Sequence, residues 1–322
     1  MKKVLLLIFL ISVSVLCVIA QTKSNKPAPK VPSVSDGIKS KTTYQFKYSS
    51  GERKKDSSLV YVKRFDEKGR MTEDSGQSGK ITYEYNDKGK LILETSFDAS
   101  GNIHYRDEYS YDGNGCLIQK KEYEGNKILF SIKSAYNIQK LETERIVSDS
   151  AGRMQMKYSF AYDDHGNKAE EIQYDSALIQ VAKRSMKFNE KGKLISLSIT
   201  GRDTTPAKYI YEYNEAGLKS KTLCYHSDGS MNYKTVYEYD AKKHLINEVT
   251  YQSAGAVRNV YQYNAKGNKT SEISYDGSGN VIEKTIFRYT DQNILSEEIE
   301  YDLYDEPSTS IKYFYEKFLL KK

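Results

Sequence analysis

The sequence predicts an all-β protein, an antiparallel β-meander of about ten repeats that forms a long twisted or spiralling β-strip. Two turn signals alternate about every 13 residues, which leaves strands of about nine residues and no room for helices. Tyr occurs 29 times, Trp never and Pro only 5 times, and hydrophobic residues make up 38% of the chain. This composition does not suit a large aliphatic core, so the repeat itself must carry the fold.

The first turn signal is Tyr-x-Tyr-Asn/Asp-x-x-Gly, as in YEYNDKG at Tyr83 to Gly89. After a first step of 20 residues, its copies follow one another at 24 to 26 residues. The second, weaker signal is an aromatic residue, Asp, two variable residues and Gly-Asn, as at Phe97 to Asn102. The ten copies of the first signal begin their turns at Asp66, Asn86, Asp112, Asn137, Asp163, Asn189, Asn214, Asp240, Asn264 and Thr290.

The residues of each turn predict its geometry. Asn or Asp at the first position accepts backbone N–H groups, and Gly at the fourth adopts the left-handed conformation of a type I turn with a bulge. Asn293 tolerates the same conformation in the last copy. Lys140 and Lys243 replace Gly in two copies and are predicted to mark weaker hairpins.

This turn type also predicts the strand register. It pairs Tyr85 with Leu91 and Tyr83 with Leu93, and the next turn pairs Phe97 with Ile103 and Thr95 with Tyr105. An aromatic and aliphatic face should then oppose a charged face, and the strip should curl over its aromatic face into a spiral or half-shell. The predicted aromatic face holds Tyr83, Tyr85, Leu91, Leu93, Phe97, Ile103, Tyr105, Tyr109, Tyr111 and Leu117. The predicted charged face holds Glu84, Lys90, Glu94, His104, Arg106 and Glu108.

The N-terminus predicts export. Lys2 and Lys3 precede an apolar run that ends in small residues, which indicates a signal peptide over residues 1–20 with cleavage after Ala20. Lipidation at Cys17 is an alternative, although Leu16 stands where lipidation signals carry Gly, Ala or Ser. Residues 21–41 are then a flexible basic linker and residues 42–322 one repeat domain without a transmembrane span, in a secreted, periplasmic or cell-surface protein.

The charge distribution argues against nucleic acid as a partner. Removal of Lys2 and Lys3 lowers the net charge from +6 to +4, and residues 22–41 alone hold +4. The repeat domain is therefore neutral and has no basic face to replace phosphate counterions. The basic linker is predicted to be a spacer, with docking to an anionic surface as the alternative.

The iterated Tyr-x-Tyr-Asn/Asp-x-x-Gly-x-Leu element, with the trailing Tyr-Asp-x-x-Gly-Asn, resembles the YD repeats of the RHS and teneurin-like proteins over about Tyr61 to Tyr315. The resemblance implies a spiralling β-strip in a secreted or cell-surface bacterial protein, where longer relatives enclose a toxin or act in adhesion and glycan contact. This chain has too few repeats to enclose a cargo domain and carries no self-cleavage segment, so small secreted YD-repeat proteins are the better likeness.

No residues form a catalytic constellation, and we expect no enzyme, no cofactor and no metal. The four histidines, His104, His165, His226 and His244, occupy different ordinary repeat positions. Adjacent glutamates such as Glu170 and Glu171, or Glu297 and Glu298, point to opposite faces of a strand and cannot flank one glycosidic bond.

Two further features have alternative interpretations. Residues 276–280 and 112–115 are Gly-rich acidic turns with possible calcium ligands, but turn hydrogen bonding already requires their aspartates. Cys116 and Cys224 lie about four repeats apart, roughly 40 Å at about 4.8 Å per strand, so we expect two unpaired thiols.

A ladder of paired tyrosines is the candidate functional feature. It packs across strands, and it also offers flat amphipathic platforms for glycans or extended peptides. We therefore expect a non-catalytic scaffold or binding surface for glycan or extracellular protein; the alternative is an assembly component whose Tyr-rich face a partner chain covers. The candidate ligand-binding residues are Tyr83, Tyr85, Tyr109, Tyr111, Tyr211, Tyr213, Tyr237, Tyr239, Tyr261 and Tyr263.

Overall fold

The computed structural model describes residues 37–49, 51–202, 205 and 207–317. These residues form 22 antiparallel strands joined by short turns. The strands are β1 Ile38–Ser49, β2 Glu52–Phe65, β3 Met71–Gly76, β4 Gly79–Tyr85, β5 Leu91–Asp98, β6 Ile103–Tyr111, β7 Leu117–Glu124, β8 Lys127–Tyr136, β9 Glu142–Asp149, β10 Met154–Tyr162, β11 Lys168–Asp175, β12 Gln180–Phe188, β13 Leu194–Gly201, β14 Ala207–Tyr213, β15 Lys219–His226, β16 Met231–Tyr239, β17 Leu245–Gln252, β18 Gly255–Tyr263, β19 Lys269–Tyr275, β20 Val281–Tyr289, β21 Leu295–Tyr301 and β22 Pro307–Lys317.

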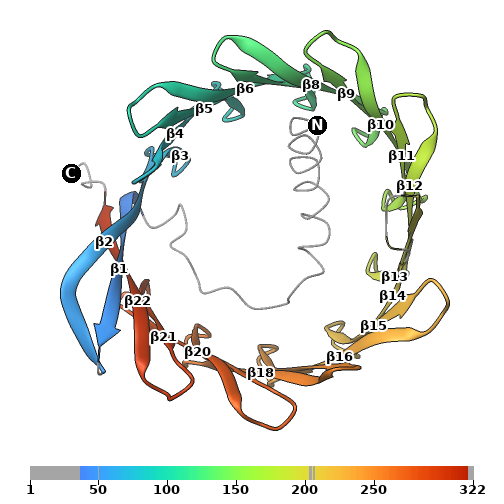
Figure 1. The fold of residues 1–322 in the computed structure, drawn as a ribbon. Helices are drawn as coiled ribbons and strands as arrows, with labels where there is room; N and C mark the ends of the chain where they lie inside the picture. The colour runs from blue at the N-terminus through green and yellow to red at the C-terminus, as the bar shows by residue number, and fades with distance from the viewer. Residues whose placement is uncertain (1–36, 50, 203–204, 206, 318–322) are drawn as a thin grey trace.

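The sheet is a closed barrel, and the predicted open, spiralling strip is wrong (Figure 1). Each strand pairs with the next, and β1 also pairs with β22, with Lys41 opposite Tyr315 and Thr43 opposite Tyr313. An open strip would leave two strand edges and its aromatic face in water, whereas closure pairs both end strands. The meander and its antiparallel pairing were predicted correctly.

The predicted turn geometry is confirmed. Asn86 Oδ1 accepts the Lys90 N–H at 2.9 Å, and Gly89 has a φ of 75°. Lys140 and Lys243 adopt the same left-handed conformation, with φ of 63° and 70°. Their hairpins therefore keep the standard turn, with the lysines in a conformation that favours Gly.

The predicted assignment of residues to the two faces is wrong beyond the first pair of each hairpin. Tyr85 pairs with Leu91 as expected, but Glu84 then pairs with Leu93 and Tyr83 with Glu94. A β-bulge at Leu91 inserts one residue, and a shift of one residue exchanges the faces of a strand. Glu94 thus joins the tyrosine face, while Leu93 and Phe97 lie on the opposite face.

This register shift recurs around the barrel. Only β3–β4, β13–β14 and β17–β18 pair without one. The second predicted hairpin is an example, because Phe97 pairs with Ile103 as expected but Ser96, not Thr95, pairs with Tyr105. Each bulge adds local bending and twist, which helps a 22-stranded sheet to close.

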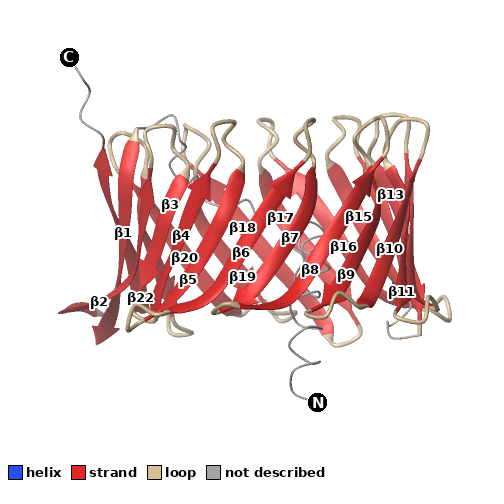
Figure 2. Ribbon diagram, turned by 90° about the horizontal axis from the view of Figure 1, so that it is seen from above, coloured by secondary structure: helices blue, strands red, loops and turns tan. Residues whose placement is uncertain are grey.

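The tyrosine face points into the barrel. Asn86 donates its N–H to Lys90 and accepts from Gly89, so Asn86 and Glu84 direct their backbone polar groups toward β5. In Figure 2 the even-numbered strands run upward, because β22 ends toward the C mark, and β4 to β9 follow from left to right along the near wall. Consider a residue on a strand that runs upward, whose N–H and C=O groups point to the right. Because amino acids have the L configuration, the side chain of such a residue points toward the viewer, which on the near wall is the outside of the barrel. Glu84 thus points outward, and Tyr83 and Tyr85 point inward.

Buried side chains form small clusters along this inner face instead of one large core. Phe130, Val147, Tyr158 and Phe160 make one cluster, and Leu197, Ile199 and Tyr211 another. These residues lie on the concave side, where neighbouring side chains crowd together. This agrees with the prediction that no large aliphatic core would form.

Several expectations concern the ends of the chain. β1 begins at Ile38, inside residues 21–41, and its Lys41 is buried. The predicted signal peptide, the Cys17 alternative and most of the basic linker lie outside the described residues. Within the described part of the chain, no helix is long and apolar enough to cross a membrane. Cys116 and Cys224 are free thiols, as expected.

The two rims of the barrel differ chemically. The turns after even-numbered strands form the upper rim in Figure 2, with charged pairs such as Glu67-Lys68 and Glu190-Lys191. The turns after odd-numbered strands form the lower rim, which concentrates eight of the twelve large apolar residues that are exposed among the described residues. These eight are Ile103, Leu178, Ile179, Met231, Tyr251, Ile282, Leu303 and Tyr304.

Candidate functional site

The ten candidate tyrosines occupy two recurring positions on the inner face. Five of them end an even-numbered strand, and the other five precede these by two residues. The sequence therefore located a real structural feature. The strand-ending group is Tyr85, Tyr111, Tyr213, Tyr239 and Tyr263, and the preceding group is Tyr83, Tyr109, Tyr211, Tyr237 and Tyr261.

The strand-ending tyrosines form a regular set of hydrogen bonds between repeats. The Tyr111 hydroxyl donates to the Leu91 carbonyl oxygen at 2.8 Å, and the Tyr263 hydroxyl to the Leu245 carbonyl oxygen at 2.8 Å. Tyr85, Tyr213 and Tyr239 make the same bond to the corresponding residues. Each acceptor lies at a bulge, where the ladder is interrupted, so the hydroxyl satisfies a backbone group.

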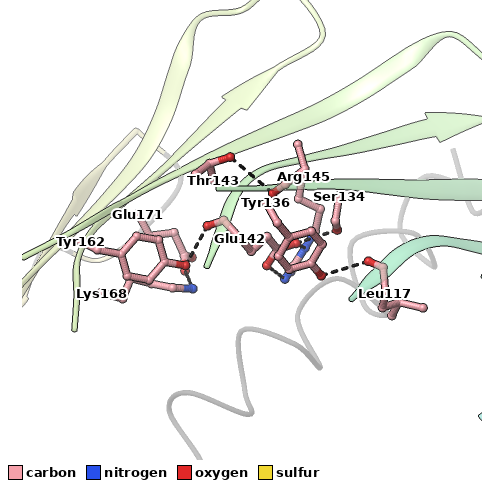
Figure 3. Close-up of polar contacts among 10 residues, drawn as sticks. Leu117, Ser134, Tyr136, Glu142, Thr143, Arg145, Tyr162, Lys168 and Glu171 are labelled. Carbon is pink, nitrogen blue, oxygen red and sulfur yellow. Dashed lines mark hydrogen bonds and ion pairs between the residues drawn. The ribbon is translucent and has the colours of Figure 1, made fainter. Parts of the chain in front are cut away.

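Tyr136 and Tyr162 extend this set, as Figure 3 shows. The Tyr136 hydroxyl donates to the Leu117 carbonyl oxygen at 2.9 Å, and the Tyr162 hydroxyl to that of Glu142 at 2.7 Å. Beside them the Arg145 guanidinium binds both carboxylate oxygens of Glu142, at 2.9 and 2.6 Å. The hydroxyls and the neighbouring charges are thus occupied in holding adjacent repeats together.

The preceding tyrosines are more deeply packed. Tyr211 and Tyr261 are only 4% and 2% exposed, so neither ring presents a free surface to a ligand. The Tyr261 hydroxyl lies 3.2 Å from Glu248 Oε2, and the Tyr237 hydroxyl 3.2 Å from Thr222 Oγ1. Burial, reinforced by Glu248, raises the pKa of Tyr261, and burial raises the pKa of Tyr83 to about 12. The hydroxyls of Tyr83 and Tyr261 therefore stay protonated at physiological pH, and that of Tyr261 donates to Glu248.

Cationic side chains cover many of the inner rings. Lys219 Nζ lies 4.9 Å from the Tyr211 ring centroid, and Lys269 Nζ lies 4.6 Å from that of Phe287. His244 stacks on Tyr263 with 4.6 Å between ring centroids. Such cation–π contacts remove further aromatic surface from any ligand. Sequence reasoning missed these cations, although Lys recurs two residues after the turn Gly in Gly217-Leu218-Lys219 and Gly267-Asn268-Lys269.

Three carboxylates meet on the inner face of β5, β6 and β7. Glu94 lies opposite Asp107, which lies opposite Glu122, and the Tyr109 hydroxyl is 3.4 Å from both Glu94 and Asp107. Lys120 is the cation within this group, with Nζ 2.7 Å from Asp107 Oδ2 and 3.6 Å from Glu122 Oε2. Burial and the nearby Asp107 carboxylate raise the pKa of Glu94 and of Glu122. The bulges bring these acids together, so the predicted register hid the cluster.

The aspartates of the Gly-rich turns, considered above as possible calcium ligands, accept hydrogen bonds within their own turns. Asp276 accepts the N–H groups of Ser278 and Asn280 at 2.9 Å each, and hydrogen bonds from Asn280 hold the pKa of Asp276 below its usual range. No group of His, Cys, Asp and Glu in the described residues is arranged to hold a metal ion. The Asp112 carboxylate likewise accepts the Cys116 N–H at 2.8 Å.

The adjacent glutamates lie on opposite faces, as predicted. Glu170 pairs with Lys183 on the outer face, whereas Glu171 pairs with Arg184 on the inner face, both at 2.5 Å. Glu171 and Glu297 are largely buried. Their ion pairs link neighbouring strands and make no catalytic pair.

Comparison with known proteins gives likeness at the level of fold class. No protein-family model matches the chain, and no curated protein matches it. Solved structures with similarity include TcdB2-TccC3-TEV, with 12% identity, TM-score 0.37, and 82% of this chain and 18% of that chain covered. The Photorhabdus luminescens Tc holotoxin pore matches with 11% identity, TM-score 0.33, and 78% and 17% covered. A porin-like protein from Bacteroides uniformis matches with 12% identity, TM-score 0.34, and 89% and 99% covered.

This chain spans less than a fifth of the Tc toxin chains that it matches. The two sources named above, Photorhabdus luminescens and Bacteroides uniformis, are bacteria.

Proposed function

We propose that this chain is a non-catalytic, secreted or cell-surface ring that acts as a scaffold and presents a binding surface to an extracellular protein. The lower rim carries this proposal. Leu303 and Tyr304 are 71% and 88% exposed there, and Leu178 and Met231 are exposed as well. Leu303 and Tyr304 are neighbours in one turn, and adjacent exposed apolar side chains commonly mark a protein interaction surface.

The structural surroundings of the paired tyrosines favour glycan binding less than their sequence pattern alone did. A sugar stacks on an open aromatic face, but Tyr211 and Tyr261 are buried and Lys219 lies over the Tyr211 ring. The strand-ending hydroxyls are already bonded to backbone carbonyls. The alternative of an assembly component is also weakened, because closure turns the Tyr-rich face inward without a partner chain.

We also propose membership in the RHS/YD-repeat family, as a small secreted bacterial member. Support comes from the ten copies of the repeat, whose motif positions have one physical role each in this fold. Asn86 and Gly89 form the turn, and the second aromatic residue of the motif, where it is Tyr as in Tyr85, bonds to the preceding bulge. The predicted signal peptide supports a secreted, periplasmic or cell-surface location.

The proposal is tested by capture of extracellular partners. The mature chain is immobilised and exposed to the secreted and cell-surface proteins of its source, and retained proteins are quantified by mass spectrometry. We expect at least one protein to bind the wild type and to be lost with Leu303→Asp combined with Tyr304→Asp. Glu84→Gln on the outer wall is the matched control and should retain it.

Two outcomes would contradict this function. Binding on a glycan array that is lost with Tyr83→Ala or Tyr109→Ala, together with no protein retention, would favour the glycan alternative. Hydrolase activity that one His substitution abolishes would show an enzyme.

A further inference from the structure

The β1–β2 hairpin leaves part of β2 without a neighbour on one side. β1 pairs with β2 from Ser49 opposite Glu52 to Ser40 opposite Arg64, with one bulge where Lys47 alone lies opposite residues 54–56 and a second bulge at Val60. On its other side, β2 pairs with β3 only from Tyr61 to Phe65. The residues from Glu52 to Val60 therefore form a strand edge that carries no strand in the described part of the chain.

The length of the next hairpin explains this free edge. β3 has six residues and ends at Gly76, where an added Cβ would lie 2.8 Å from the Val60 carbonyl oxygen. Gln77 then donates from its Nε2 to the Leu59 carbonyl oxygen at 3.1 Å. The Leu59 carbonyl thus faces this edge, and the alternation of a strand directs the N–H and C=O groups of Ser57 to the same side.

The edge is open to solvent, and its three basic residues, Arg53, Lys54 and Lys55, outnumber its two acids, Glu52 and Asp56. Every residue from Glu52 to Ser58 is exposed. Lys54, Lys55 and the neighbouring Lys47 form no ion pair within the described residues, whereas Arg53 binds Glu297 on the outer wall at 3.1 Å. The adjacent turn from Gln77 to Gly79 carries no acid. Figure 1 shows this hairpin splaying outward from the wall of the barrel.

We propose that an extended, acidic segment of a partner protein adds to this edge as a further strand. Backbone N–H and C=O groups of such a segment would pair with those of Ser57. Its carboxylates would meet Lys54 and Lys55. The inference deepens the proposed function by naming how an extracellular protein partner binds, and it rests on contacts separate from the apolar lower rim.

The same lysines disfavour a second copy of this chain as the occupant. Two β2 edges side by side would bring Lys54 and Lys55 of one copy against those of the other, and lysines on edge strands oppose such pairing. The lysines attract an acidic strand and repel a basic strand or a second copy of this one. The edge therefore selects its partner by charge.

Fluorescence anisotropy with a labelled ten-residue peptide of alternating Glu and Val tests this directly. We expect the mature protein to bind the peptide, and to bind a Lys and Val peptide of equal length at least tenfold more weakly. Ser57→Pro removes the edge N–H without breaking a bond within the barrel, and should weaken binding at least tenfold. Ser57→Ala keeps the N–H and should bind as the wild type does.

The charge contribution is tested by Lys54→Glu combined with Lys55→Glu, which should reverse the preference between the two peptides. Circular dichroism and thermal unfolding verify that each variant folds. Equal binding of the acidic peptide to the Pro and Ala variants would overturn strand addition. A dimer in analytical ultracentrifugation that Ser57→Pro dissolves would overturn it in favour of a second copy. If the peptide binds but the Leu303 and Tyr304 variants lose no protein partner, the rim proposal alone fails.

Discussion

The Tyr239 hydroxyl donates a 2.9 Å hydrogen bond to the Lys219 carbonyl oxygen, 20 positions earlier in the chain. The acceptor lies at the bulge where Tyr213 pairs with Lys219. One side chain thus connects two successive repeats at a point where the backbone ladder is interrupted. The recurrence of this bond makes the strand-ending tyrosine part of the barrel wall.

Tyr239→Phe should destabilise the barrel by about 1 kcal/mol, because it leaves the Lys219 carbonyl without its partner while the ring still packs. For a domain of this size the melting temperature should fall by about 2 °C. Thermal unfolding measured by circular dichroism tests this. Tyr251→Phe is the matched control, because Tyr251 is 48% exposed and its hydroxyl bonds to nothing in the described residues. An equal effect of both substitutions would refute the structural role of the hydroxyl.

Phe188→Tyr should stabilise the protein. Phe188 ends β12 at the position of the strand-ending tyrosines but has no hydroxyl for the Lys168 carbonyl at the preceding bulge. The added bond should contribute about 0.5 to 1.5 kcal/mol. Urea unfolding should show a higher midpoint with an unchanged slope. Phe160→Tyr is the comparison, because Phe160 precedes a strand end and faces no such carbonyl, and it should give no gain.

Glu122→Gln should stabilise the barrel at neutral pH. The folded state raises the pKa of Glu122 through burial and the nearby Asp107, so it holds the proton more tightly than the unfolded chain does. The protonated group therefore favours folding below the unfolded value of about 4.5, and this contribution is lost as pH rises through the folded pKa. Gln mimics the protonated form at every pH.

Unfolding by urea at pH 7 and at pH 4 measures this effect. The advantage of Glu122→Gln over the wild type should be largest at pH 7 and should shrink at pH 4. The exposed outer-wall substitution Glu84→Gln should change stability little at either pH. A variant less stable than the wild type at pH 7 would mean that the Lys120 ion pair outweighs the cost of burying the carboxylate.

Lys140→Gly should stabilise the turn between β8 and β9. Lys140 has a φ of 63°, and a non-Gly residue in this region costs about 1 to 2 kcal/mol. The greater unfolded entropy of Gly offsets part of the gain, so we expect a net gain of about 0.5 kcal/mol. Gln139→Gly, one residue earlier in the same turn, should bring no gain. If both substitutions destabilise equally, the lysine side chain offsets its own backbone cost.

The sequence did not predict which residues lie on which face of the sheet beyond the first pair of each hairpin. The spacing of Asn86 and Gly89 predicts the turn and the pair Tyr85 with Leu91, since these depend on residues close in the chain. The bulge at Leu91 depends on how the hairpin twists against its neighbours. The sequence around Leu91 is equally compatible with a regular strand that has no bulge, so Glu94 was predicted to lie on the charged face. The acidic cluster that Glu94 forms with Asp107 and Glu122 was therefore not predicted.

The sequence by itself determined the all-β class, the repeat length, the positions of the ten main turns and the left-handed Gly or Asn in eight of them, because each follows from contacts within about five residues. The left-handed conformation of Lys140, Lys243, Leu178 and Asp305 was not predicted. Tertiary structure alone decided closure, since Thr43 meets Tyr313 only after 22 strands have accumulated their twist. It also decided that the tyrosines face inward under a cover of lysines. The periodic sequence pattern is compatible with both an open strip and a closed ring. The ring is favoured because closure pairs the two end strands, which an open strip leaves unpaired.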